Sequence, residues 1–124
     1  MSIGLEKNWR LEKDFSRGKF CYLIGVNGWS IELKECEFNS LYELLNKLYK
    51  QFLDIHSELM EEELVTIEID HLNWYVELEG DRNNWSLRLI YESPEDTRSF
   101  EMYWPIPIAK NLFFEMRKMW ESRH

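Results

Sequence analysis

The sequence predicts an α+β fold in which an antiparallel β-meander followed by a helix occurs twice. Two groups of short segments alternate apolar and polar residues, as half-buried strands do, and turn residues separate the segments. A longer segment with helical periodicity follows each group. We therefore expect one domain over residues 1–124, with a first sheet–helix unit at about 8–60 and a second at about 64–122. Both helices should pack on twisted sheet.

The first group contains three predicted strands. Residues 8–15 alternate in polarity, and residues 20–26 are rich in aromatic and β-branched side chains. Asn27-Gly28 favours a two-residue hairpin turn, because both residues tolerate positive φ. Residues 29–34 alternate again, so we expect them to pair antiparallel with the preceding strand.

The segment from about 35 to 60 predicts a long central helix. Glu35 and Glu37 fall in its first turn, where the helix dipole favours acidic side chains. Its large apolar residues recur at steps of three and four: Phe38, Leu41, Leu44, Leu45, Leu48, Phe52, Ile55 and Leu59.

The second group contains four predicted strands, at residues 65–70, 74–79, 84–91 and 100–104. Pro105 and Pro107 end the last of them, because proline has no N–H to donate to a ladder. A C-terminal helix is expected from about Pro107 onward. Its apolar stripe is Ile108, Leu112, Phe113, Met116 and Trp120.

Aromatic residues make up 15% of the chain, and most tryptophans are expected in the core. They share the apolar sides of the alternating segments: Trp9, Trp29, Trp74, Trp85 and Trp104. Cys21 and Cys36 are interpreted as small, buried or half-buried apolar residues. Two cysteines are too few for a disulfide framework or a four-thiolate metal site, which fits a reducing cytoplasm.

The acidic charge is concentrated in one segment. The chain has 23 acidic and 15 basic residues, for a net charge of −8. Nine of the acids lie in a stretch without lysine or arginine: Glu58, Glu61, Glu62, Glu63, Glu68, Asp70, Glu77, Glu79 and Asp81. Alternation puts Glu68, Asp70, Glu77 and Glu79 on outward positions of one hairpin. We interpret these four as an acidic protein-docking patch, which favours a basic partner and repels a polyanion.

A second interpretation is single-stranded nucleic-acid binding. Such binding combines a basic groove with aromatic stacking platforms. Arg10, Arg17, Lys19 and Arg82 are the candidate basic rim. Because the tryptophans are expected in the core, nucleic acid is an alternative partner and not the favoured one.

Catalytic and metal-binding patterns are absent from the sequence. His56, His71 and His124 stand in no nucleophile–base motif, and no phosphate-cradling glycine loop is present. The run Glu61-Glu62-Glu63 would diverge on either a helix or a strand, so it converges poorly on a cation. We therefore expect no catalytic residues, no metal and no cofactor.

The sequence predicts a location in the cytoplasm. No apolar stretch approaches the ~18 residues of a membrane-spanning helix, so no membrane association is expected. Residues 1–7 lack the apolar run of a signal peptide.

Two features predict a homo-oligomer, a dimer or larger. Tyr42, Tyr49 and Leu53 lie off the main stripe of the central helix, and such apolar residues need burial or a partner. The last helix carries outward basic residues that would complement the acidic segment of a second copy: Lys110, Arg117, Lys118 and Arg123.

Three runs carry a family resemblance. They are W-R-L-E-K-D-x-S-R-G-K-F at 9–20, E-L-E-G-D-R-x-x-W-S-L-R at 77–88 and F-E-x-Y-W-P at 100–105. The ensemble resembles an uncharacterised family of cyanobacteria and plants, the domain of unknown function DUF1818. The resemblance implies a fold like that of the Whirly single-stranded-DNA-binding transcriptional regulators, with two sheet–helix repeats. It implies no site residue, and the chain lacks the lysine-rich binding motif of the Whirly proteins.

These observations together favour a non-enzymatic cytoplasmic module for binding or assembly. The alternative is a nucleic-acid-binding, transcription-related protein that uses the basic rim. A third hypothesis is an enzyme without a recognisable motif, which would need convergent polar residues in a pocket.

Overall fold

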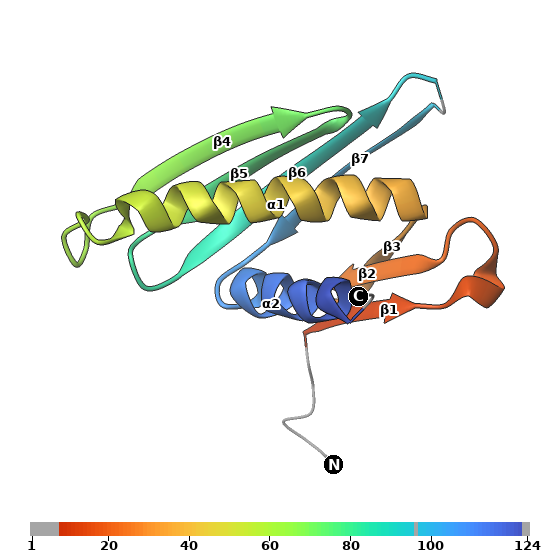
Figure 1. Ribbon diagram of the computed structural model, residues 1–124, viewed down its shortest axis with the longest axis horizontal. Helices are drawn as coiled ribbons and strands as arrows, with labels where there is room; N and C mark the ends of the chain where they lie inside the picture. The colour runs from red at the N-terminus through yellow and green to blue at the C-terminus, as the bar shows by residue number, and fades with distance from the viewer. Residues whose placement is uncertain (1–7, 96, 123–124) are drawn as a thin grey trace, which may run out of the picture.

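The computed structural model describes residues 8–95 and 97–122, and it has an α+β architecture of two antiparallel sheets and two helices (Figure 1). The elements are β1 (Trp9–Lys13), η2 (Phe15–Arg17), β2 (Tyr22–Val26), β3 (Trp29–Leu33), α1 (Glu35–His56), β4 (Val65–His71), β5 (Trp74–Gly80), β6 (Trp85–Ser93), β7 (Arg98–Trp104) and α2 (Ile108–Glu121). The predicted repeat of a meander and a helix is confirmed. Residues 1–7, Arg123 and His124, which entered the sequence analysis, lie outside the described residues.

The first sheet has the order β1-β2-β3, and its second hairpin turns where the sequence predicts. Asn27 and Gly28 have φ values of 50° and 90° and connect Val26 to its ladder partner Trp29. Positive φ at both central residues matches the right-handed twist of the flanking strands, which explains the choice of asparagine and glycine.

The second sheet has the order β4-β5-β6-β7, so each strand pairs antiparallel with the next. Gly80 ends β5 where the chain doubles back tightly. A Cβ atom there would lie 2.3 Å from the carbonyl oxygen of Asn84. Glycine is therefore required at this turn by the close approach of two backbone segments.

The core lies between the helices and the inner faces of the sheets. Helix α1 contacts β4 and β5, while α2 contacts β1 and β6 (Figure 1). The largest side chains enclosed there are Trp74, Trp85, Trp104, Tyr22, Phe38 and Phe113. Tyr22 of β2 stacks on Phe38 of α1 with 3.9 Å between ring centroids, which ties the first sheet to the long helix.

Three local expectations are wrong. Helix α1 ends at His56 instead of near 60, because the amide of Leu59 bonds back to the His56 carbonyl in a tight turn that buries the leucine. Trp29 is 39% exposed, since it begins an edge strand directly after a hairpin turn. Cys36 is exposed, because it lies in the first turn of α1 on the side away from the core.

Helix α2 covers two of the three side chains that suggest a second subunit. Tyr42 is 5% exposed and stacks on Trp120 with a centroid distance of 4.7 Å. Tyr49 is half-buried, with its ring 5.2 Å from that of Phe113. Of the three, only Leu53 is exposed, so the aromatic part of the argument for oligomerisation has an intramolecular explanation.

Neither described helix has the length and apolarity that crossing a membrane requires.

Candidate functional site

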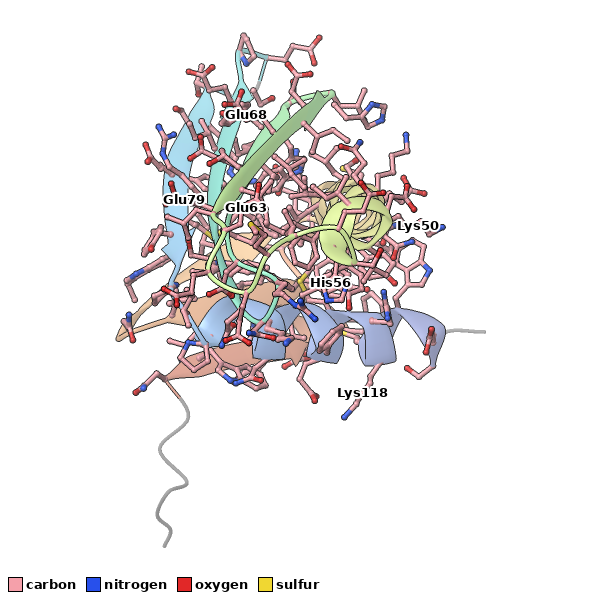
Figure 2. The ribbon with its side chains drawn as sticks, turned by 90° about the vertical axis from the view of Figure 1, so that its left-hand side faces the viewer. Lys50, His56, Glu63, Glu68, Glu79 and Lys118 are labelled. Carbon is pink, nitrogen blue, oxygen red and sulfur yellow. The ribbon has the colours of Figure 1, made fainter. Side chains whose placement is uncertain are left out.

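The outer face of the four-stranded sheet is the most distinctive surface of the described chain. The helices pack against the opposite, inner face, so this face is open to solvent (Figures 1 and 2). We call it the acidic face, and its carboxylates are Glu68, Asp70, Glu77, Glu79, Glu92 and Glu101. The four residues of the predicted docking patch therefore lie together on one surface. Figure 2 shows Glu68 and Glu79 away from α1, and Lys50 on the far side of that helix.

Strand register sets the spacing of these side chains. Glu68 of β4 is opposite Glu77 of β5, which is opposite Arg88 of β6. In the next row, Asp70 is opposite Tyr75. Like charges directly across a ladder are destabilising, so the Glu68–Glu77 pair is unfavourable for the isolated fold.

Arg88 is the one basic side chain on the acidic face. Its Nε donates to Oε2 of Glu101 at 2.8 Å, and its Nη1 lies 3.7 Å from Oε1 of Glu77. These two carboxylates, the first above all, raise the pKa of Arg88. One guanidinium cannot neutralise six carboxylates, so the face keeps a strong negative potential.

Tyr75 shows the effect of that potential on a neutral group. Partial burial raises the pKa of its phenol, and the charges of Glu68 and Glu77 raise it further. A phenolate beside two carboxylates would be repelled, so the hydroxyl stays protonated and able to donate a hydrogen bond.

Less polar side chains interrupt the acidic face near its middle. Tyr75 and Ile90 are ladder partners and are half-buried, while Tyr103 of β7 is 54% exposed. Aromatic and apolar residues surrounded by polar ones are typical of protein interfaces. Arg88 is the one positive charge that the described residues of this face offer to a phosphate.

The predicted basic rim is divided by the fold. Arg10 and Arg17 both bind Glu12, with N–O distances of 2.7 and 2.6 Å. These contacts lower the pKa of Glu12, with the Arg10 hydrogen bond the larger cause. Lys19 lies in the adjacent loop with its Nζ 5.5 Å from the ring centroid of Phe20. Two of the four candidate cations therefore already share one carboxylate.

Arg82 lies apart from the other three residues of the rim. It follows β5, and its Nη1 donates to the Leu59 carbonyl at 3.4 Å, next to the loop after α1. That loop is at the opposite end of the molecule from the β1–β2 connection (Figure 1). The structure therefore brings Arg10, Arg17 and Lys19 into one region and leaves Arg82 out of it.

The sequence analysis missed a buried ion pair that joins the two sheet–helix units. The Glu37 carboxylate, with 2% of its side chain exposed, pairs with Arg98 of β7 and accepts from the Lys34 amide at 2.8 Å. Arg98 also donates to the Glu32 carbonyl at 2.8 Å and stacks over Phe20. The detectable signal was Arg98 itself, since it occupies an inward position in an alternating strand.

A hollow of about 360 Å³ lies beside this ion pair. Its lining includes Cys36, Glu37, Asn73 and Tyr91. Burial raises the pKa of Tyr91, and its hydrogen bond to Glu37 raises it further. The lining residues contain no histidine or lysine, and Arg98 engages the Glu37 carboxylate. Glu95 is the other carboxylate of the lining, and within the described residues no hydrogen bond joins it to the Cys36 thiol, so the hollow shows no nucleophile–base pair.

No metal-binding cluster occurs in the described ranges: no three histidine, cysteine, aspartate or glutamate side chains there converge on a common point.

Known proteins share the sequence family and the fold of this chain, but the matched family and structure have no known function. The model of the family DUF1818, a domain of unknown function, matches residues 5–119. A crystal structure of a protein with unknown function from the DUF155 family, from Prochlorococcus sp. NATL2A, is 37% identical, with a TM-score of 0.84. The match covers 96% of this chain and 99% of that chain. No curated protein matches.

Proposed function

Because the chain belongs to the DUF1818 family, whose function is unknown, we propose a function from its geometry: a non-enzymatic module that binds a basic protein through the acidic face. The observation that supports this proposal is an open sheet face with six carboxylates and one arginine around Tyr75, Ile90 and Tyr103. Both helices pack on the other face of the sheet, so no described helix covers this surface.

The charge pattern favours a role in association. Complementary charge accelerates encounter with a basic partner and sets its orientation, more than it adds to affinity. Binding of this kind weakens with ionic strength, because salt screens exposed charges. The apolar centre supplies the contact area that charge alone does not.

Charge reversal on the acidic face tests the proposal. We would compare affinity capture by the wild-type protein and by Glu68→Lys/Glu77→Lys, with Glu43→Lys/Glu62→Lys as a control. Both control residues are exposed and lie off the acidic face, so the net charge change is matched. We expect basic proteins to be lost from the first variant and retained by the control. An unchanged set of captured proteins from the first variant contradicts the proposal.

One observation supports nucleic acid as a second candidate. Lys13, Arg17 and Lys19 lie in or next to the β1–β2 connection, where the ring of Phe15 is 59% exposed and its centroid lies 4.9 Å from Lys13 Nζ. Fluorescence anisotropy of labelled single-stranded DNA and RNA, at low and near-physiological salt, tests this site. Saturable binding that falls steeply with salt and is lost in Lys13→Glu/Lys19→Glu supports it. Absence of binding at low salt rejects it.

Three further statements are part of the proposal. The two sheet–helix units support a likeness to the Whirly fold, which superposition onto a Whirly structure tests.

The free thiols of Cys21 and Cys36 support a reducing compartment such as the cytoplasm, which cell fractionation tests. Exposed Lys118 on α2, which binds Glu115 within the chain, has a charge complementary to the acidic face, and this complementarity supports a homo-oligomer, which sedimentation at high micromolar concentration tests. A species of only 15.2 kDa would reject it.

A further inference from the structure

The free edge of β4 is a second feature of the acidic face. β4 pairs with β5 on one side, and the described residues place no strand on its other side. Figure 1 shows this seven-residue strand along the margin of the sheet, beside the C-terminal part of α1. A strand edge presents unpaired backbone N–H and C=O groups. β4 contains neither the proline nor the lysine that natural edge strands often use to prevent pairing.

The two rows of β4 side chains differ in chemistry. Glu68 and Asp70 point outward and are exposed. Val65, Ile67 and Ile69 point inward but are only half-buried, although α1 packs against this strand. The edge therefore offers an acidic row on one side and an incompletely covered apolar row on the other.

Exposed leucines lie at both ends of this edge. Leu64 precedes β4 and is 73% exposed, and Leu72 follows it and is 74% exposed. Leu72 has a φ of 57°, in the left-handed region that a branched side chain seldom adopts. Together with the half-buried inward row, the leucines extend the apolar part of the edge.

The charges exclude one occupant and select another. An added strand from a second copy of β4 would place Glu68 and Asp70 near their own counterparts, and like charges across a ladder repel. A strand with lysine or arginine at alternate positions would instead face these carboxylates. Its intervening apolar residues would then lie beside Ile67 and Ile69.

We propose that the β4 edge binds an extended basic segment of a partner protein by strand addition, with basic and apolar residues alternating along that segment. Backbone hydrogen bonds to the edge hold the segment, and the alternate side chains set its register. This inference rests on the proposed function, because the acidic face supplies the charge that selects the partner.

The test uses two labelled heptapeptides and fluorescence anisotropy. One alternates four lysines with three valines, and its control has proline in place of each valine. Charge and length are equal, but proline removes N–H groups and does not extend a sheet. Each peptide is titrated with the wild-type protein, Glu68→Lys and Glu92→Lys. Glu92 is exposed on the acidic face but lies on β6, away from the edge.

Strand addition predicts that the valine peptide binds at least about tenfold more tightly than the proline peptide. It also predicts that Glu68→Lys weakens the valine peptide at least about tenfold, and Glu92→Lys less than about threefold. Equal binding of the two peptides, or equal effects of the two variants, would overturn the inference but leave a charge-dependent acidic face. No binding of either peptide to the wild-type protein would count against both the inference and the proposed function.

Discussion

The buried ion pair of Glu37 and Arg98 gives the sharpest prediction about stability. Arg98→Met removes the guanidinium and leaves the Glu37 carboxylate, with 2% of its side chain exposed, among apolar groups. Removing one partner of a buried pair costs about 3–5 kcal/mol. Because the Arg98 side chain is 22% exposed, we expect the lower end, about 3 kcal/mol. For a chain of this length, that loss lowers Tm by about 10 °C.

Urea unfolding followed by tryptophan fluorescence measures this cost, and Arg88→Met is the matched control. Arg88 also binds two carboxylates, but on an exposed face, where such pairs contribute less than about 1 kcal/mol. A double-mutant cycle with Glu37→Gln should give a coupling energy of at least about 1 kcal/mol. The reasoning is refuted if Arg98→Met costs no more than Arg88→Met, or if the two single changes add.

Three smaller predictions concern turns. Asp81 accepts from the amides of Asn83 and Asn84 at 2.8 and 3.0 Å, which lowers its pKa from 3.8. Its stabilising effect is thus present above pH 3.8 and lost as the pH falls through the lowered pKa. Asp81→Ala should lower Tm at pH 7, and its effect should shrink as the pH is lowered below 3.8. Gly80→Ala should cost about 2 kcal/mol in urea unfolding, because its Cβ would clash with the Asn84 carbonyl; an unchanged midpoint contradicts this. Leu72→Gly should raise the free energy of unfolding by up to about 1 kcal/mol, since it relieves a left-handed backbone; a lower value contradicts this.

The elements that the sequence predicts well are those with local causes. Asn27-Gly28 fixes its hairpin through backbone conformation alone, without help from distant residues. The strands of the second sheet can be predicted because one face of the sheet is buried and the other is exposed to solvent. Apolar and polar residues therefore alternate along each strand with a period of two. For the same reason, the sequence alone assigns Glu68, Asp70, Glu77 and Glu79 to one face.

The parts that the sequence did not predict depend on distant contacts. Glu37 and Arg98 are 61 residues apart, and the first looked like an ordinary acid in a helical turn. Arg82 was grouped with Arg10 by charge sign alone, but charge carries no information about which end of a sheet a turn occupies. Tyr42 and Tyr49 looked unpartnered, because the sequence does not show that α2 packs against that side of α1.

The separation of the two sheet faces explains why the acidic face can be examined by mutation. The large buried side chains and the Glu37–Arg98 pair all lie on the inner side of the sheet or at its junction with α1. The outer carboxylates contribute little to that packing, and the Glu68–Glu77 pair even opposes it. Reversing Glu68 should therefore leave the fold intact while it reverses a charge on the β4 edge. A basic segment bound at this edge, as proposed, would relieve the repulsion between Glu68 and Glu77, which the fold itself does not need.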